Sequence, residues 1–154
     1  ISTLYHAFRS ERLKAVFRVL DHISIFLLIA GTYTPFTLVN LRGPWGWSIF
    51  GVIWGLAIAG IVFKLFMTGR WQVFSSLVYI MMGWVVLIAF KPLFASVDLS
   101  GVLWLIAGGM AYTLGVIFYS MKTMPYHHAI WHCFVLLRST CHFFAIYFHV
   151  LPMP

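Results

Sequence analysis

Residues 45–63 read WGWSIFGVIWGLAIAGIVF, a run of nineteen residues without a charged side chain. A helix of about 20 apolar residues crosses the hydrocarbon core of a bilayer, so this run predicts a transmembrane span from Trp45 to Phe63. The whole chain shares this character, since 62% of its residues are hydrophobic, 8% are charged and the mean hydropathy is +0.96. A soluble domain of 154 residues could not hide so much apolar surface, so we expect lipid to be the solvent.

Four more apolar runs of similar length predict four more spans, which are His22–Leu41, Trp71–Phe90, Leu99–Met121 and Tyr126–Leu151. The stretch before them, Ile1–Phe8, is too short to cross, and the chain begins at Ile without a signal peptide. We therefore expect the front of the protein to be missing and Ile1–Phe8 to end an earlier helix. The predicted fold class is an all-α integral membrane helix bundle. Residues 1–154 form one polytopic domain with five full spans, incomplete at its amino end.

The net charge of +7 invites a nucleic-acid partner, but the basic residues are dispersed among the spans, so we expect none. The positive-inside rule accounts for them better. Loops on one side of the membrane collect seven of the ten, which are Arg9, Arg12, Lys14, Arg18, Lys64, Arg70 and Lys122. The other side has Arg42 and Lys91, and Arg138 lies inside a span. We expect the first side to be cytoplasmic and the carboxyl end to lie outside, in a multi-pass protein of the cell's inner (plasma) membrane.

Three local patterns predict packing within the bilayer. Cys133 and Cys141 are eight residues apart on one helix, ~12 Å along its axis, which is too far for a disulfide. Small residues four apart let helix backbones approach closely in a bilayer. The sequence has two such series, Gly51–Gly55–Ala59 and Ala107–Ala111–Gly115, and both predict helix contacts. Thr32, Thr34 and Pro35 predict a local kink in which the Thr hydroxyls bond the freed carbonyl groups.

One pair of histidines stands out at the head of the last span. His128 and His132 are four residues apart, so they lie one above the other on the same face of a helix. Two imidazoles stacked in this way form half of a zinc site. Histidine is costly in hydrocarbon unless it is paired or binds something, so the pair predicts a functional site.

Two other polar residues share the depth of this pair. His6 comes just before the basic loop Arg9–Arg18, and Asp21 comes just after it. Three imidazoles with an open position make a catalytic zinc site, so His6, His128 and His132 are the predicted metal ligands and Zn²⁺ is the predicted cofactor. A metal there would lower the pKa of a bound water towards ~7, and Asp21 could orient that water or take its proton. Ser2, four residues before His6 on the same face, could hold the water or a substrate oxygen.

Each of these residues also has a simpler interpretation. Any one of the histidines could be an interfacial or hydrogen-bonded residue, Asp21 could form a salt bridge with Arg18 or cap a helix, and Ser2 could take part in ordinary helix packing. His22, His127 and His149 are most simply interfacial, although His127 could replace His128. His142 lies ~15 Å deeper than His132, too far for the same metal, so it could line the cavity above the site or bond another helix. Two haems on His128 and His142 would need a second helix with matching histidines, and the sequence has none.

The motifs together resemble a known family. They are Ser-x-x-x-His at residues 2–6, Asp-His at 21–22, IAGTYTPF at 29–36 and HAIWHxFV at 128–135, followed by Ser139 and His142-Phe143. They are similar to those of the bacterial hemolysin III proteins, which belong with the progestin and adipoQ receptors, including the adiponectin receptors. The likeness covers nearly the whole chain. It departs at Arg138, where family members usually have a small residue.

The resemblance implies a bundle of seven transmembrane helices, of which this chain lacks the first and most of the second. It also implies that His6, His128 and His132 bind zinc and that Asp21 contacts the zinc-bound water. Adiponectin receptors are proposed to be ceramide hydrolases, so we expect a zinc-dependent, hydrolase-like protein acting on an amide or ester of membrane lipids. The alternatives are a pore-forming hemolysin, or a lipid-homeostasis receptor or sensor with structural zinc. The oligomeric state is left open.

Overall fold

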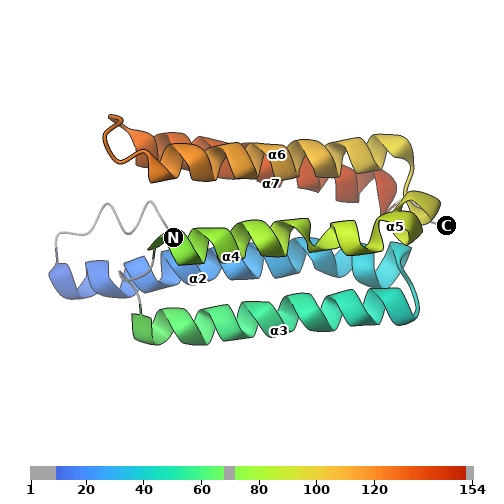
Figure 1. Cartoon of the computed structure of the whole chain (residues 1–154), viewed down its shortest axis with the longest axis horizontal. Helices are drawn as coiled ribbons and strands as arrows, with labels where there is room; N and C mark the ends of the chain where they lie inside the picture. Colours follow the sequence, from blue (N-terminus) through green and yellow to red (C-terminus); the bar gives the residue numbers. More distant parts are fainter. Residues whose placement is uncertain (1–9, 68–71, 152–154) are drawn as a thin grey trace.

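The chain forms a bundle of helices that run in alternating directions (Figure 1). The computed structural model describes residues 10–67 and 72–151, and every regular element within these ranges is helical. In chain order the elements are α2 (Glu11–Pro35), the π-helical segment η1 (Phe36–Asn40), α3 (Pro44–Met67), α4 (Gln72–Trp84), the 3₁₀ segment η2 (Val85–Ala89), α5 (Phe90–Ser96), α6 (Leu99–Ser120) and α7 (His127–His149). The predicted integral membrane helix bundle is confirmed.

Within the described residues, four helical segments are long and apolar enough to cross a bilayer. They are Pro44–Met67, Phe74–Ser96, Leu99–Ser120 and His127–His149. Four of the five predicted spans are thus found, with shifted ends. The first predicted span, His22–Leu41, is not among them, and it is divided between α2, which ends at Pro35, and the π-helical segment η1. Its helical segments α2 and η1 nevertheless pack against α3 in the bundle.

Five basic residues assigned to loops from the sequence lie in helices, which are Arg12, Lys14 and Arg18 of α2 and two lysines further along the chain. Lys64, assigned to a loop from the sequence, lies inside α3 with its side chain fully buried. Lys91, also assigned to a loop, is the second residue of α5, because the third span continues six residues beyond Phe90 to Ser96. The sequence misplaced both lysines because a single lysine near the end of an apolar run looks like the start of a connection.

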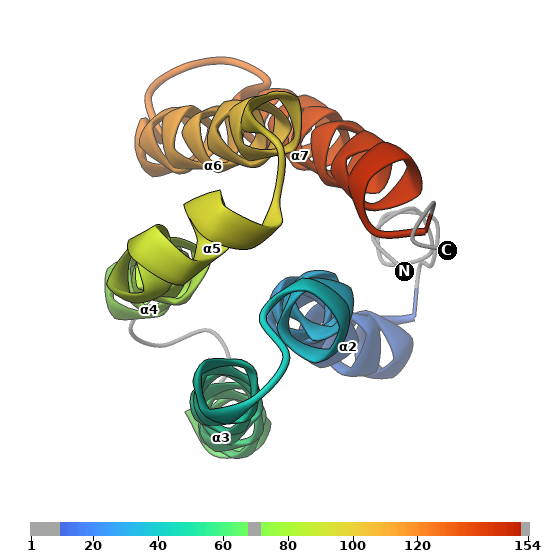
Figure 2. The ribbon, with the colours of Figure 1, turned by 90° about the vertical axis from the view of Figure 1, so that its right-hand side faces the viewer.

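In the end-on view α2 lies beside α3 and α6 lies beside α7 (Figure 2), and buried side chains of α2, α3, α4, α6 and α7 form one core. Phe26, Ile53 and Met82 come from the first three helices and are at most 2% exposed. Phe26 meets Tyr79 edge to face with ring centroids 4.6 Å apart, and its ring also fills the space beside Gly60. These contacts hold the middle of α2 against α3 and α4.

The helix is irregular at Pro35 as predicted, but the hydroxyls of Thr32 and Thr34 do not bond the carbonyl of Gly31, which is the one that Pro35 leaves without its helix bond. Proline lacks the N–H that would bond the preceding turn, and here α2 ends at Pro35 and continues as π-helix. The hydroxyls of Thr32 and Thr34 donate to the carbonyls of Leu28 and Ala30 at 2.6 and 2.9 Å. The wider turn closes with Leu41 N–H donating to Phe36 O at 2.9 Å.

A second irregularity, between α4 and α5, was not predicted. Pro92 cannot donate to the carbonyl of Ile88 four residues earlier, and the 3₁₀ segment η2 contains Ile88. Tyr33 from α2 completes the break: its hydroxyl donates to Gly83 O at 2.8 Å and accepts from Val86 N–H at 3.0 Å. A polar side chain inserted in this way satisfies backbone groups that hydrocarbon would leave unpaired.

The packed faces of the helices differ from those that the small residues predicted. Gly51, Gly55 and Ala59 of α3 point outward, and no atom lies within 4 Å of a Cβ built on either glycine. On α6 the contact with α7 runs through Gly101, Gly108 and Gly115, seven residues apart, where an added Cβ would meet His149, His142 and Phe134. The predicted series on α6 was right for Ala111 and Gly115 and wrong for Ala107, which is exposed.

Candidate metal centre

A polar cleft opens at the end of the bundle where α6 turns into α7 (left in Figure 1). Side chains from five helices line it, which are Asp21, His22 and Ile25 of α2, Lys64 of α3, Ser75, Ser76 and Tyr79 of α4, Tyr119 of α6, and His128 and Trp131 of α7. Most of the lining side chains are polar, whereas the lipid-facing surface of the bundle is apolar. Such a gathering of polar groups in a membrane helix bundle marks a functional site.

The cleft brings together three of the predicted site residues. A carboxylate oxygen of Asp21 and one ring nitrogen each of His128 and His132 lie within 4.8 Å of one another, and all three side chains are half-buried. One aspartate and two histidines are ligand types that zinc uses. The sequence could place these residues only at a common depth, and the fold brings their ligand atoms together, with Asp21 and His128 lining the cleft.

The two imidazoles meet at their Nε2 atoms. These atoms are 3.1 Å apart, and the rings cross at 84° with centroids 4.7 Å apart. Two nitrogen ligands at 2.0–2.1 Å from a tetrahedral zinc ion are about 3.3 Å apart, so the observed pair has nearly the separation that a shared ion requires. The donor set and the geometry of the pair therefore fit a zinc ion.

The start of α7 sets the position of His128. Tyr126 adopts a left-handed conformation with φ 60° and begins the helix, so the chain turns sharply just before the pair. One turn into α7, Trp131 is buried against Tyr112 and Tyr119 of α6, with ring centroids 5.2 and 5.5 Å away. The ring centroid of Tyr119 also lies 5.9 Å from the ring centroid of His128. Aromatic packing thus fixes the helix face that presents both histidines.

Asp21 reaches the cleft from the middle of α2. The helix begins at Glu11, ten residues earlier, so Asp21 is not a helix cap and that simpler interpretation is wrong. The basic segment through Arg18, predicted as a loop, is helical from Glu11 onward. The hydroxyl of Ser24 donates to the backbone carbonyl of Asp21 at 2.7 Å, so this bond does not involve the carboxylate.

The other predicted residues have separate outcomes. Ser2 and His6 lie outside the described residues. His127 is not part of the group, and its Nδ1 lies 3.1 Å from Met124 O within the preceding turn. Cys133 and Cys141 are free, as predicted. His142 lines a second cavity and its Nε2 lies 3.3 Å from Leu105 O, so both expectations for it are met.

Several cleft residues were missed from the sequence. Lys64 brings an ammonium group into the cleft, and Ser75 and Ser76 add two buried hydroxyls. The buried Tyr79 donates to the backbone carbonyl of His22 at 3.1 Å, which ties α4 to α2 beside the site. A signal was present, since a lysine and two adjacent serines interrupt runs that are otherwise apolar, and polar residues within membrane helices tend to face the interior.

Comparison with known proteins places these motifs in a family. The sequence model described as "Haemolysin-III related" matches residues 1–143. Hemolysin-3 of Bacillus cereus is 48% identical over 151 residues, which cover 98% of this chain and 69% of that protein. The Hemolysin-3 homolog of Bacillus subtilis (strain 168) is 45% identical over 153 residues, which cover 99% of this chain and 72% of that protein.

A more distant relative comes from animals. The human monocyte to macrophage differentiation factor is 28% identical over 163 residues, which cover all of this chain and 66% of that protein. No solved structure matches the chain.

Proposed function

The chain belongs to the haemolysin-III-related family, and from this premise we propose that it is a zinc-dependent, hydrolase-like membrane protein that acts on amide or ester bonds of membrane lipids. The observation that carries the proposal is the convergence of the ligand atoms of Asp21, His128 and His132 within 4.8 Å of one another, in a bundle with helices long enough to span the membrane. His6, predicted to be the third histidine ligand, completes the proposed site.

The residues have distinct roles in this proposal. His128 and His132 hold the metal through their Nε2 atoms. When bound, a zinc ion supplies Lewis acidity at the carbonyl group to be cleaved. Asp21, less than 5 Å from the histidine nitrogens, orients the attacking water and accepts its proton, as a carboxylate positioned within hydrogen-bonding reach can do. Lys64 and the serines of α4 provide positive charge and hydrogen bonds on the opposite wall.

The position of the cleft supports a lipid substrate. It opens near the end of the bundle, beside helices whose outward side chains are mostly apolar, and Ile25 and Trp131 give it apolar walls. An amide or ester of a membrane lipid lies at the boundary between head group and acyl chain. A substrate held there can present its carbonyl to the polar cleft while its chains stay in hydrocarbon.

A pore is the alternative function, because a 48% identical relative is named Hemolysin-3. A conducting path needs polar groups along the whole thickness of the bilayer. Here the cleft shares no lining residue with the deeper cavity, and the contact between Tyr112 and Trp131 lies between the two. A lipid sensor with structural zinc is the third possibility, and it differs from the hydrolase only in lacking turnover.

One reconstitution experiment separates the three. The protein is placed in liposomes that contain ceramide or an ester lipid and an entrapped dye, and free fatty acid and released dye are both measured. We expect fatty acid to form while dye stays inside, and we expect His128→Ala and His132→Ala to abolish the product. His127→Ala is the matched control, because His127 lies beside the pair but outside the metal group.

The other outcomes reject the hydrolase. Dye release that persists in both histidine variants without any lipid product would establish the pore. Zinc binding without product from any of the tested lipids, and without leakage, would favour the sensor.

A further inference from the structure

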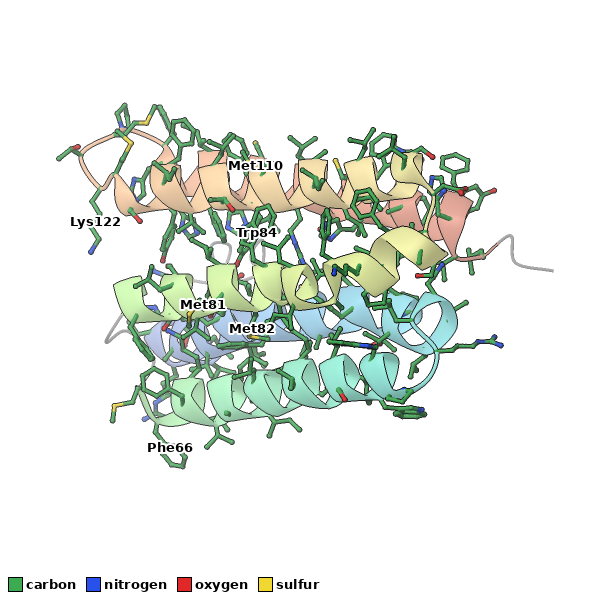
Figure 3. The ribbon with its side chains drawn as sticks, turned by 45° about the vertical axis from the view of Figure 1, so that its right-hand side comes forward. Phe66, Met81, Met82, Trp84, Met110 and Lys122 are labelled. Carbon is green, nitrogen blue, oxygen red and sulfur yellow. The ribbon has the colours of Figure 1, made fainter. Side chains whose placement is uncertain are left out.

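A second cavity lies deeper in the bundle, between α2, the α4–α5 segment, α6 and α7. Its volume is about 70 Å³, which leaves room for about two particles of the size of a water molecule, whose share of liquid volume is ~30 Å³. Trp84 forms one wall and reaches from α4 to α6, where its Nε1 donates to the hydroxyl of Thr113 at 3.2 Å (Figure 3). A cavity of this size admits a small ion with a water molecule and excludes an extended alkyl chain.

Some polar side chains on the cavity wall already have partners. The hydroxyls of Thr32 and Tyr33 donate to backbone carbonyl oxygens at 2.6 and 2.8 Å. Other lining atoms are buried and have no hydrogen-bond partner within the described part of the chain, which are Nη1 of Arg138, the hydroxyl oxygen of Tyr112 and Nδ1 of His142. Buried polar groups in folded proteins are almost always paired, so three unpaired atoms in one cavity indicate an occupant.

Arg138 brings a permanent positive charge to this cavity. It lies eleven residues into α7, roughly 16 Å from the first residue of the helix, and is 2% exposed. A guanidinium group stays charged under all ordinary conditions, so burial does not neutralise it. The ring centroid of Tyr112 lies 5.2 Å from Cζ of Arg138, and such a cation–π contact offsets only part of the cost of burying the charge.

The acidic residues of the chain are all engaged away from Arg138. Glu11 pairs with a lysine one turn away at 3.5 Å, Asp98 lies 3.8 Å from a histidine near the end of α7, and Asp21 belongs to the candidate metal centre. A buried charge without a counter-charge is strongly destabilising. Water can accept hydrogen bonds from the guanidinium group but carries no charge, so it cannot replace an anion there.

The unpaired atoms differ in what they can bind. Nη1 of Arg138 and the hydroxyl of Tyr112, a residue only 3% exposed, are hydrogen-bond donors. His142 plays a different part, because its Nε2 lies 3.3 Å from Leu105 O and must donate to it. Its Nδ1 is therefore an acceptor in the neutral ring, which a water molecule can satisfy and an anion cannot.

We propose that this cavity binds one small monovalent anion, of about the size of chloride, between Nη1 of Arg138 and the hydroxyl of Tyr112. One cation balances one negative charge, and charge-assisted hydrogen bonds from a guanidinium group are among the stronger ones in proteins. The rest of the cavity holds a water molecule that donates to Nδ1 of His142. Because Tyr112 is on α6 and Arg138 is on α7, the ion joins these two helices and stabilises the bundle.

This site is separate from the candidate metal centre. The two cavities share no lining residue, and Arg138 lies six residues, ~9 Å along α7, beyond His132. Binding of an anion at Arg138 therefore does not depend on the proposed metal or on turnover, and it can be measured on protein from which metal has been stripped.

The test measures thermal unfolding of the purified chain in neutral detergent after treatment with a chelator. Chloride replaces gluconate, a bulky monovalent anion, at constant ionic strength. We expect the melting temperature to rise and then level off with chloride, by about 5–10 °C at a hundredfold excess over the dissociation constant. Bromide should act as chloride does, and anomalous diffraction from crystals grown in bromide should place the ion beside Arg138 and Tyr112.

Variants test the two donors. Arg138→Gln should raise the half-saturating chloride concentration at least tenfold, and Tyr112→Phe, which keeps the ring, should raise it severalfold. The readout is the chloride dependence of the melting temperature, so a change in the stability of a variant in gluconate does not affect it. Arg42→Gln removes the same charge at an exposed position and should respond to chloride as the unmodified chain does.

Four results would overturn the proposal. Equal melting temperatures in chloride and gluconate would show that the cavity holds water only. A chloride response that the chelator removes would place the anion on the metal. An equal rise in sulfate that does not level off would identify a general salt effect. A bromide ion found elsewhere would refute the assigned donors. If Arg138→Gln does not fold, the response of the unmodified chain, Tyr112→Phe and the position of bromide still decide.

Discussion

At the scale of single residues, the candidate metal centre depends on one helical turn. His128 and His132 are separated by four residues, so both rings leave α7 on the same side, and their Nε2 atoms are 3.1 Å apart. Trp131 lies between them in sequence but points the other way, into the contact with α6. The same turn thus supplies both the ligands and the packing that orients them.

Zinc binding is the first prediction at this scale. Removing one of two paired imidazoles leaves too few ligands for tight binding, so His128→Ala and His132→Ala should each lower the zinc content of the purified protein at least tenfold. Elemental analysis per mole of protein measures this. His127→Ala should retain the zinc of the unmodified chain, and equal zinc in all four proteins would show that the pair is not a metal site.

Asp21 gives the second prediction. Asp21→Asn keeps the size of the side chain but removes the negative charge that accepts a proton, so lipid hydrolysis should fall ~10²–10⁴-fold while zinc is retained. Fatty acid release and zinc content are measured on the same preparation. Asp98→Asn is the control, because Asp98 is an exposed acid at the other end of the bundle. Unchanged turnover in Asp21→Asn would rule out its role as the base.

At the scale of elements, α6 and α7 form the most extensive helix contact in the described chain. The glycines on α6 at 101, 108 and 115 let α7 approach closely, and the space that they leave is filled by His149, His142 and Phe134. This packing matters for the candidate metal centre, because His128 and His132 are on α7. A shift of α7 would move both candidate ligands together.

A pair of glycine substitutions tests this element. In Gly115→Ala the new methyl group would lie 2.7 Å from Cβ of Phe134, which cannot swing away, so we expect destabilisation of about 1–3 kcal/mol. In Gly55→Ala, on the outward face of α3, no atom lies within 4 Å and the better helix former should stabilise by up to ~1 kcal/mol. Thermal unfolding in detergent should show a lower melting temperature for the first variant and an equal or higher one for the second.

The opposite ranking would mean that the outward face of α3 is covered in the membrane and that the α6–α7 contact is loose. The comparison is matched, because both substitutions add one methyl group to a glycine within a long helix.

At the scale of the whole molecule, the helix connections alternate between the two ends of the bundle (Figure 1). The basic residues divide unequally between these ends. Within the described residues the metal-cleft end has Arg12, Lys14, Arg18, Lys64 and Lys122, and the other end has Arg42 and Lys91. This asymmetry supports an orientation with the metal cleft at the cytoplasmic side.

The fourth prediction concerns that orientation. A reporter enzyme that is active only outside the cytoplasm should work when fused after Pro154. The same reporter inserted beside Lys122, in the exposed turn between α6 and α7, should be inactive. The reversed pattern would place the cleft on the outer side and contradict the positive-inside argument.

Properties that depend on a short stretch of the chain, such as span length and the face of a helix on which a residue lies, could be predicted from the sequence. Runs of ~20 apolar residues predicted the helices, because the thickness of the bilayer sets their length. The spacing of His128 and His132 predicted their shared face, because helix geometry alone determines it. The depth of Asp21 followed from the alternation of connections. Residues 29–36 and 128–135 also carried enough of the family pattern for the resemblance that the comparisons confirm.

Only the tertiary structure decided which faces of the helices meet. Lipid and the interior of the bundle are both apolar, so a membrane helix carries no hydrophobic contrast to mark its packed face. For this reason Gly55 was expected in a contact and points outward, whereas Lys64 was expected in a loop and lies buried in the cleft. The insertion of Tyr33 into the break after Gly83, and the enclosure of Arg138 beside Tyr112, join residues far apart in the chain, and long-range packing alone brings them together.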